Sequence, residues 1–350
     1  MLKNSVFVLL FGVLSCSCVL AGQKADGEIA ARAFYLRMNG SLSDAIDLLE
    51  DSDDPAAQFE LARCYMVNMK VQCKNDALTT EQKKKTIKQQ IDLAHKAISK
   101  AIKADASNRR YYYQAGIIDT FRAVYDAHSV WTIAGLPAGS ISSINNYKKA
   151  VRLDPDFHKA RQNLMGLYDR LPWYCGGSKD DAEKQLKILM EKDVVYGARA
   201  QCEIRPRKKP EQKVEIWKKA VEQLPDDPAV HYELACAYIN AKQNEDARIH
   251  INKAIELDVS ADTMLLAYAD ACRRVNEFQK ARQLIEQYLN SEPDPSRLHK
   301  AKAYRILAKV MKQQGDPEKE HVLRDLAGEL DPYDIMSQNR IDADDLFTAP

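Results

Sequence analysis

The sequence predicts an all-α fold, a right-handed solenoid of stacked helical hairpins. Along most of the chain, apolar residues recur at spacings of three and four, which places them on one face of a helix. Strand-like alternation is rare, and 13 glycines and 13 prolines are few for 350 residues. The same combination of large and small side chains also returns at a fixed offset, which is typical of repeat architectures.

The clearest hairpin lies between Pro228 and Val259. Proline suits the first turn of a helix, and polar residues 242–244 form a turn between two helices. The small side chains of Ala235 and Ala247 lie where the two helices would cross closely. The first helix carries its stripe on Leu234, Ala235 and Tyr238, and the second on Ala247, Ile251 and Ala254. One hairpin cannot bury both faces, so the pattern requires neighbouring hairpins.

Two further units follow in register, at intervals of about 34 residues. They contain Tyr268, Ala269, Cys272, Ala281, Ile285, Tyr288 and Pro293, and then Leu307, Ala308, Met311, Ala327 and Pro332. This pattern of small, large and terminal proline positions resembles the tetratricopeptide repeat family. The resemblance implies a superhelix whose first helices line an inner groove. In the last unit Glu320 and Arg324 replace small and apolar residues, which is expected of a terminal capping hairpin.

The N-terminal residues 1–21 are typical of an export signal. Lys3 precedes a short apolar run, and small residues would permit cleavage after Ala21. An uncleaved anchor stays open, and so does a lipidated Cys16, because residues 13–16 distantly resemble a bacterial lipobox. In each version the body of the protein is exported, to the periplasm or the cell envelope, and touches a membrane only through this segment.

Residues 22–332 are predicted as one solenoid of about seven irregular hairpins. Insertions are expected near residues 67–82, 123–140 and 171–180, where polar or Pro- and Gly-containing stretches interrupt the repeat spacing. Residues 333–350 carry several aspartates and no helical stripe, so a flexible acidic tail is expected there.

The balanced net charge and the lack of known catalytic motifs argue against nucleic-acid binding and against catalysis. With 51 basic and 50 acidic residues, the net charge of +1 provides no general attraction for nucleic acid. The seven histidines are scattered, with His250 and His321 expected on solvated faces, and no phosphate-binding loop or nucleophile motif occurs. We therefore predict no catalytic residue, metal or cofactor; a hydrolase is a distant third interpretation.

Cysteine spacing leaves its pairing open. If the chain is exported, Cys64 with Cys73 or Cys175 with Cys202 could form disulfides. Cys272 occupies a core position of its repeat, which favours a buried free thiol.

Basic residues gather on the predicted inner face of the last two units. They are Arg273 and Arg274, followed by Lys302, Arg305, Lys309 and Lys312. This stripe predicts a groove that binds an acidic peptide or a carboxylate of a partner protein, although a solvated face is the alternative. The asparagines of the carboxylate clamp known in the tetratricopeptide family are missing.

Aromatic residues suggest a second hypothesis. Tyr113, Ile117 and Phe121 recur every four residues, near Trp131, and could line an apolar groove unless the insertion covers them. The stretch at 172–182, with Trp173 and Tyr174, resembles an element of the tetratricopeptide accessory component of tripartite periplasmic transporters. That resemblance implies an accessory, ligand-handling protein with an apolar cavity lined by these residues; a loop that resets the curvature is the alternative.

Overall fold

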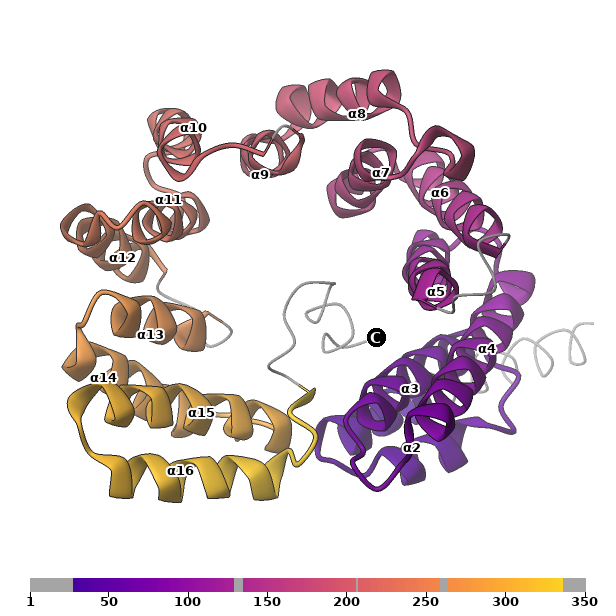
Figure 1. Ribbon diagram of the computed structural model, residues 1–350, viewed down its shortest axis with the longest axis horizontal. Helices are drawn as coiled ribbons and strands as arrows, with labels where there is room; N and C mark the ends of the chain where they lie inside the picture. The colour runs from indigo at the N-terminus through magenta and orange to yellow at the C-terminus, as the bar shows by residue number, and fades with distance from the viewer. Residues whose placement is uncertain (1–27, 129–134, 206, 259–263, 336–350) are drawn as a thin grey trace, which may run out of the picture. The chain divides into compact units, whose positions relative to one another are not determined.

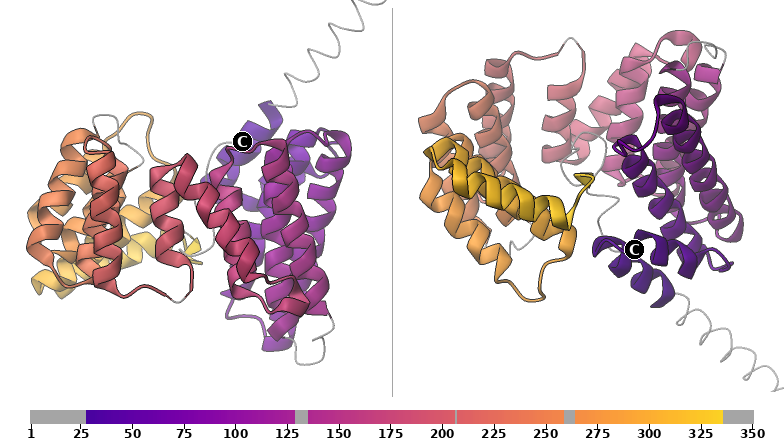
Figure 2. Two further views of the ribbon diagram at one scale, coloured as in Figure 1. Left: turned by 90° about the horizontal axis from the view of Figure 1, so that it is seen from above. Right: turned by 60° about the horizontal axis from the view of Figure 1, so that its bottom comes forward.

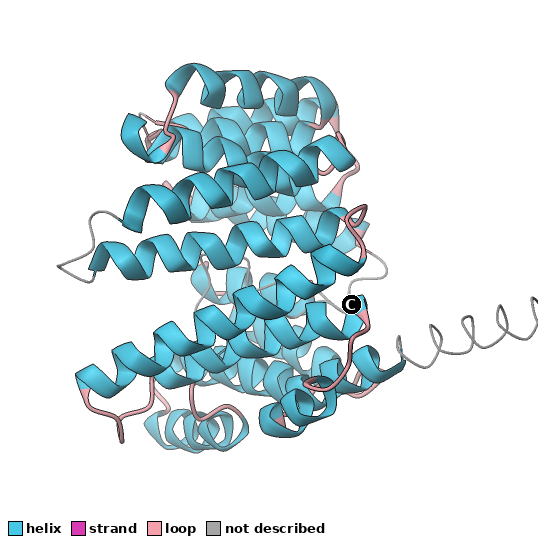
Figure 3. Ribbon diagram, turned by 90° about the vertical axis from the view of Figure 1, so that its right-hand side faces the viewer, coloured by secondary structure: helices cyan, strands magenta, loops and turns pink. Residues whose placement is uncertain are grey.

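The computed structural model of the chain describes residues 28–128, 135–205, 207–258 and 264–335. All regular elements in these ranges are helices, and no strand occurs among them (Figure 3). No helix in the same ranges is long and apolar enough to cross a membrane. The export signal predicted at 1–21, Trp131 and most of the acidic tail lie outside the described residues.

The chain forms two compact units that meet in the sequence between Gln114 and Ala115. Residues 22–332, predicted as one solenoid, therefore fall into two units. The first contains a helix over residues 28–38, α2 (Leu42–Leu49), α3 (Pro55–Cys73), α4 (Thr80–Ala104) and the start of α5 (Arg109–His128). The second contains the rest of α5, α6 (Gly135–Leu153), α7 (His158–Arg170), η1 (Trp173–Cys175), α8 (Lys179–Lys192), α9 (Val194–Glu203), α10 (Pro210–Gln223), α11 (Pro228–Asn240), α12 (Asn244–Leu257), α13 (Leu265–Arg274), α14 (Phe278–Leu289), α15 (Arg297–Gln314) and α16 (Pro317–Leu330).

In the first unit, α3 and α4 pack against each other as a long hairpin. The insertion predicted near residues 67–82 is mostly helical, because α3 extends to Cys73 and α4 already begins at Thr80. A capping box starts α4: the Thr79 hydroxyl accepts from the Gln82 amide, and the Gln82 side chain accepts from the Thr79 amide. The extra residues therefore lengthen the hairpin.

A buried ionic network lies inside the first unit. Glu60 accepts hydrogen bonds from Arg37 Nε at 2.7 Å and from Arg63 Nη1 at 2.9 Å, and all three side chains are fully buried. The Arg63 guanidinium also lies over the Phe59 ring, 5.5 Å from its centroid. Burial lowers the pKa of Arg63 to about 10, and the charge of Glu60 opposes that shift. Glu60 therefore holds two cationic side chains inside the protein.

The second unit is a stack of helical hairpins (Figures 1 and 2). From α7 onward, first and second helices alternate, and each helix packs on the next along the chain. First helices also contact the following first helix, as α7 with α9 and α13 with α15. One continuous apolar core extends from Ala198 to Met311. The predicted all-α solenoid of stacked hairpins is confirmed.

The hairpin of α11 and α12 has the predicted geometry. Ala235 and Ala247, the two small residues at the expected crossing, are fully buried, as are Leu234 and Ile251 on the flanking turns. Asp227 caps α11 by accepting from the amides of its first turn, and Pro228 occupies the first helical position. Sequence analysis missed α9, a continuous helix of ten residues that contains Gly197.

Candidate functional site

In the part of the chain that the structure describes, some side chains of the predicted basic stripe form ion pairs or hydrogen bonds within the protein, and others do not. On α15, Arg305 binds Asp331 and Asp334, with nitrogen–oxygen distances of 2.9 Å in both ion pairs. Lys309 and Lys312 are exposed and Lys302 is half-buried. These three lysines, the α15 lysine stripe, have no ion-pair partner among the described residues. Their spacing of seven and three places them within one side of the helix.

The two arginines of α13 connect neighbouring hairpins. Arg273 donates to Gln313 of α15 at 2.9 Å and pairs with Asp270 of its own helix. Arg274 donates to Asn240 of α11, also at 2.9 Å. These bonds run between consecutive first helices. Stacking therefore uses part of the charge that the sequence suggested for binding, and leaves the α15 lysine stripe beside it.

The predicted aromatic lining consists of residues in very different environments. Tyr113 and Ile117 on α5 are buried, and Phe121 is partly buried. By contrast, Trp173 is 84% exposed and Tyr174 is 50% exposed. The two exposed rings contact each other edge to face, with centroids 5.8 Å apart. They thus form an exposed surface, while Tyr113 and Ile117 belong to the helix packing.

Residues 172–178, the aromatic loop, are held in one conformation by the backbone. The amides of Cys175 and Gly177 both donate to the Pro172 carbonyl, at 2.9 and 3.0 Å, and Ser178 donates to Tyr168 at 3.0 Å. Gly176 has a φ of +89°, which favours glycine. Cys175 is fully buried and anchors the loop from below. The insertion predicted near 171–180 is therefore an ordered turn that presents two aromatic rings.

A cluster of ion-paired side chains adjoins the aromatic loop. The side chain of Asp169 is almost fully buried and pairs with Lys179 Nζ at 2.5 Å and with Arg205 Nε at 3.1 Å. Arg205 also donates to the Asp169 carbonyl. The hydrogen bonds and charges of these two cations lower the pKa of Asp169, although its burial acts in the opposite direction. Both cationic side chains remain partly exposed, so two positive groups flank the loop.

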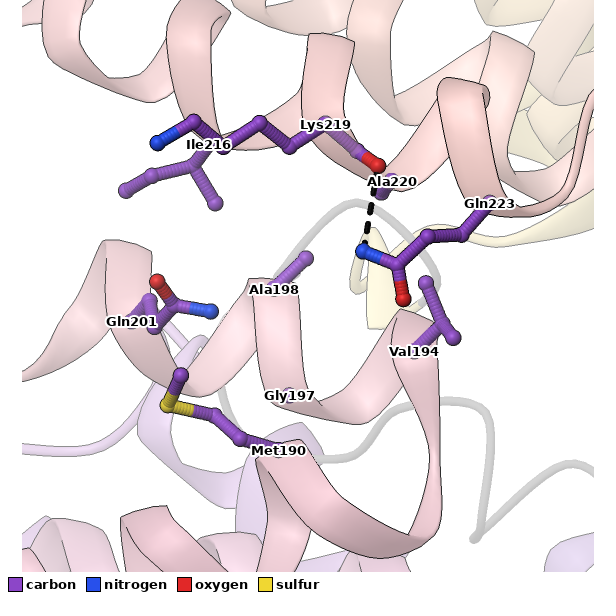
Figure 4. A pocket seen from close by; sticks show the side chains of 9 residues that line it. All are labelled: Met190, Val194, Gly197, Ala198, Gln201, Ile216, Lys219, Ala220 and Gln223. Carbon is purple, nitrogen blue, oxygen red and sulfur yellow. Dashed lines mark hydrogen bonds between the residues drawn. The ribbon is translucent and has the colours of Figure 1, made fainter.

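Two cavities occur where successive second helices flank a first helix. The first, about 260 Å³, lies between α8 and α10 above α9 (Figure 4). Its lining combines apolar and amide groups: Met190, Val194, Gly197, Ala198, Gln201, Ile216, Lys219, Ala220 and Gln223. Gln223 is fixed by donating to the Lys219 carbonyl at 3.2 Å. A side chain on Gly197 would lie 2.8 Å from the Met190 Cα, so glycine permits the close packing of α9 on α8.

The second cavity, the terminal cavity, lies among α14, α15 and α16 and measures about 460 Å³. Its apolar residues are Leu307, Met311, Val322 and Leu323, and its charged residues are Arg282, Glu286, Glu318 and Lys319. Because no hairpin follows α16 in the described residues, this apolar surface is left open, and Val322 is 65% exposed. Its size is in the range of pockets that receive small organic groups.

Neither thiols nor metal ligands form a reactive site in the described part of the chain. Its six cysteines, at 64, 73, 175, 202, 236 and 272, are all free, so the two disulfides considered above are not formed. Cys272 is buried as predicted. Burial raises the pKa of all six thiols, to about 12 for Cys64 and Cys272. No group of three or more His, Cys, Asp and Glu side chains in the described ranges could hold a metal ion.

A histidine pair was missed by sequence analysis. His231 Nε2 lies 2.8 Å from the Pro225 carbonyl, which can only accept, so this nitrogen carries the proton. His231 Nδ1 then accepts from His250 Nδ1 at 2.9 Å. His250 stacks between His231 and Tyr238. The prediction of a solvated His250 is wrong, because α11 and α12 bring these rings together; His321 is exposed as predicted, beside Asp325.

We expect this pair to make stability fall in mild acid. Burial and then the neighbouring His231 lower the pKa of His250 below its ordinary value of 6.5. The unfolded chain therefore binds a proton more readily below pH 6.5, and the free energy of unfolding decreases as pH falls from there through the folded pKa. Unfolding midpoints between pH 8 and 5 should drop less for His250→Gln than for wild type. His321→Gln should behave like wild type; equal slopes for all three proteins would contradict the prediction.

Stacked helical hairpins, each packed on the next, define a class, the helical-repeat proteins. Residues 228–258 match the family model described as tetratricopeptide repeat. The match covers the hairpin of α11 and α12, and it confirms there the resemblance to the tetratricopeptide repeat family that was drawn from the sequence.

Solved structures with a similar arrangement are distant in sequence. YrrB, described as a tetratricopeptide repeat protein with an unusual peptide-binding site, is 14% identical over 68% of this chain and 94% of its own, with a TM-score of 0.30. A tetratricopeptide repeat protein from Parabacteroides merdae is 11% identical over 93% of this chain and 98% of its own, with a TM-score of 0.40. The human IFIT1 dimer with m7Gppp-AAAA is 14% identical over 87% and 77%, with a TM-score of 0.43. No curated protein matches the chain by sequence.

Proposed function

We propose that this protein is an exported, non-catalytic scaffold whose first-helix face binds an acidic segment of a partner protein. The observation that carries the proposal is the α15 lysine stripe. Lys302, Lys309 and Lys312 share one side of a helix without a carboxylate partner among the described residues, whereas Arg273 and Arg305 next to them are ion-paired. The neighbouring ion pairs keep the helices in place, so the lysines are presented on a fixed surface.

The chemistry of this surface favours a peptide with spaced carboxylates. Lysine is a flexible cation that attracts carboxylates without requiring a single geometry. Individual exposed ion pairs contribute only about 0.2–1 kcal/mol each, so useful affinity requires several lysines to act together. An extended or helical acidic segment can do this, because its carboxylates recur along one side as the lysines do.

Charge reversal tests the proposal. We expect the triple variant K302E/K309E/K312E to bind a fluorescent glutamate-rich peptide at least tenfold more weakly than wild type, measured by anisotropy in low salt, because three attractions become repulsions. The matched control is K96E/K100E/K103E, which reverses three exposed lysines on one side of α4 in the other unit. If both variants lost the same affinity for the peptide, the loss would follow from the change in net charge alone, and the proposal would be contradicted.

The proposal that the protein is exported is based on the apolar run near its N-terminus. N-terminal sequencing of the protein from the cell envelope, with Gly22 as the expected first residue, tests that part separately.

A further inference from the structure

The inner face of α3 is closed, in contrast to that of α15. Ala62 of α3 and Ala308 of α15 occupy the same small position of the repeat, which aligns the two helices. The inner-face residues of α15 are partly or fully exposed, whereas their counterparts on α3 are at most 6% exposed. The counterparts of Arg305, Lys309 and Lys312 are Phe59, Arg63 and Met66. The face that carries exposed lysines on α15 is thus covered on α3.

The buried charges of the first unit are mostly positive. In its described residues, the charged side chains that are buried belong to Arg37, Arg63 and Lys70 and to one acidic residue, Glu60. Burial and then the charge of Arg37 lower the pKa of Lys70, and Arg37 acts on Arg63 as well, so the three cations form one cluster. With Glu60 included, this cationic cluster has an excess of two positive charges.

The acidic residues of the loop before α3 have other roles. Glu50 accepts a hydrogen bond from the Tyr65 hydroxyl at 2.8 Å, and Asp54 caps α3 by accepting from an amide of its first turn. Asp51 and Asp53 are exposed, so water and salt screen their charges. Screening is much weaker inside the protein, and the excess charge of the cationic cluster therefore favours an anionic segment on this face.

A segment of the same chain has the opposite charge. Residues 336–350, which follow the described part of the chain, contain three aspartates and one arginine and so carry a net charge of −2. This charge equals the excess of the cationic cluster and is opposite in sign. Leu346 and Phe347 directly follow the last aspartate, and such side chains suit the apolar surface of Phe59 and Met66.

The spacing of the segment also fits α3. Phe59 and Arg63 are one helical turn apart, about 6 Å along the helix. In an extended chain, residues two apart lie on the same side, about 7 Å from each other, and Asp345 and Phe347 have this separation in the sequence. An extended segment antiparallel to α3 therefore brings Phe347 to Phe59 and Asp345 to Arg63. The earlier aspartates then lie near the level of Lys70, about 10 Å further along α3.

We propose that residues 341–347 bind in an extended conformation along the inner face of α3, with their aspartates at the cationic cluster. Covalent connection gives such a segment a high effective concentration, so the contact needs only modest intrinsic affinity. The inner face of the first unit is then closed to acidic segments of other proteins, which leaves their binding to α15. The inference goes beyond the proposed function and uses none of the α15 lysine stripe.

Carbodiimide cross-linking of the full chain, followed by mass spectrometry, tests the contact. The reagent joins a carboxylate and an amine that touch, forming an amide with loss of water. The lowered pKa of Lys70 favours its reactive neutral amine. We expect an amide between Lys70 and an aspartate of residues 342–345, and none in the variant D342N/D344N/D345N. In a mixture of unlabelled and nitrogen-15-labelled protein, both joined peptides should carry the same label, because the contact lies within one chain.

A synthetic peptide of residues 336–350 measures the recognition itself. We expect D342N/D344N/D345N, whose own segment is weakened, to bind the fluorescent peptide at least tenfold more tightly than wild type, whose site is occupied. Adding K70M to that variant should weaken binding at least fivefold, because methionine keeps the side-chain length and removes the charge. Adding K302E/K309E/K312E instead is the control and should leave binding of this peptide unchanged. Circular dichroism checks that each variant is folded.

Several outcomes would overturn the inference. Cross-links from the aspartates to lysines of α15, with loss of peptide binding in K302E/K309E/K312E, would place the segment on the α15 lysine stripe and leave the proposed function standing. Joined peptides with different labels would assign the contact to a second copy of the chain. Absence of the Lys70 cross-link, or a wild type that binds the peptide as tightly as the D342N/D344N/D345N variant does, would show that the segment does not occupy this face.

Discussion

Replacing Glu60 with glutamine should destabilise the first unit by about 3–5 kcal/mol, the usual effect of removing one member of a buried ion pair. Glutamine keeps the volume but removes the charge, so Arg37 and Arg63 would lose their common carboxylate inside the protein. Hydrogen exchange of the α3 amides should accelerate by about two to three and a half orders of magnitude, since about 1.4 kcal/mol corresponds to a factor of ten.

The control is Glu81→Gln on α4 of the same unit. Glu81 pairs with Lys84 at 2.8 Å, but both side chains are exposed, so its loss should change stability by no more than about 0.5 kcal/mol. If Glu60→Gln accelerated exchange no more than Glu81→Gln does, the buried network would not hold the first unit together. Exchange is measured on the full chain, so each unit is followed by its own peptides.

Replacing Gly177 with alanine should cost about 3 kcal/mol or more in the second unit. A Cβ at this position would lie 1.8 Å from the Leu171 carbonyl oxygen and 2.5 Å from its carbon, and backbone atoms cannot move aside by rotation. The turn would open, with loss of the hydrogen bonds from Gly177 to Pro172 and from Ser178 to Tyr168. Denaturant unfolding followed by the emission of buried Trp217 measures the effect.

Gly328→Ala in α16 is the matched control with the opposite sign. No atom lies within 4 Å of a Cβ added there, and alanine is favoured over glycine inside a helix, so stability should rise by up to about 1 kcal/mol. A Gly177→Ala protein as stable as wild type would mean that the aromatic loop is not rigid.

The hairpins could be predicted because they follow from local spacing. Alternation of large and small residues every three or four positions determines which side of each helix is buried, and Ala235 and Ala247 are fully buried as expected. The helix α9 escaped notice because its apolar and small residues, with Gly197 among them, do not reproduce the large and small positions of the repeat. The aromatic residues of α5 and of the loop were grouped by type, yet one set is buried and the other exposed.

The candidate site could be predicted only in part. Periodicity placed Arg305 and Lys309 on one side of α15, but Arg305 is occupied by Asp331 and Asp334. In the same way Arg274 is engaged by Asn240, which is 34 residues away. These partners lie outside the helix that carries the arginine, and spacing within one helix carries no information about them.

The amino-acid sequence by itself determined that this protein is a stack of helical hairpins, because burial of a periodic apolar stripe is a local property of each helix. Only the tertiary structure decided which charged and aromatic side chains remain available to a partner. That depends on contacts between residues about one repeat apart, which pair Arg305 with Asp331 and bury Glu60 with Arg37 but leave Trp173 and Lys309 exposed.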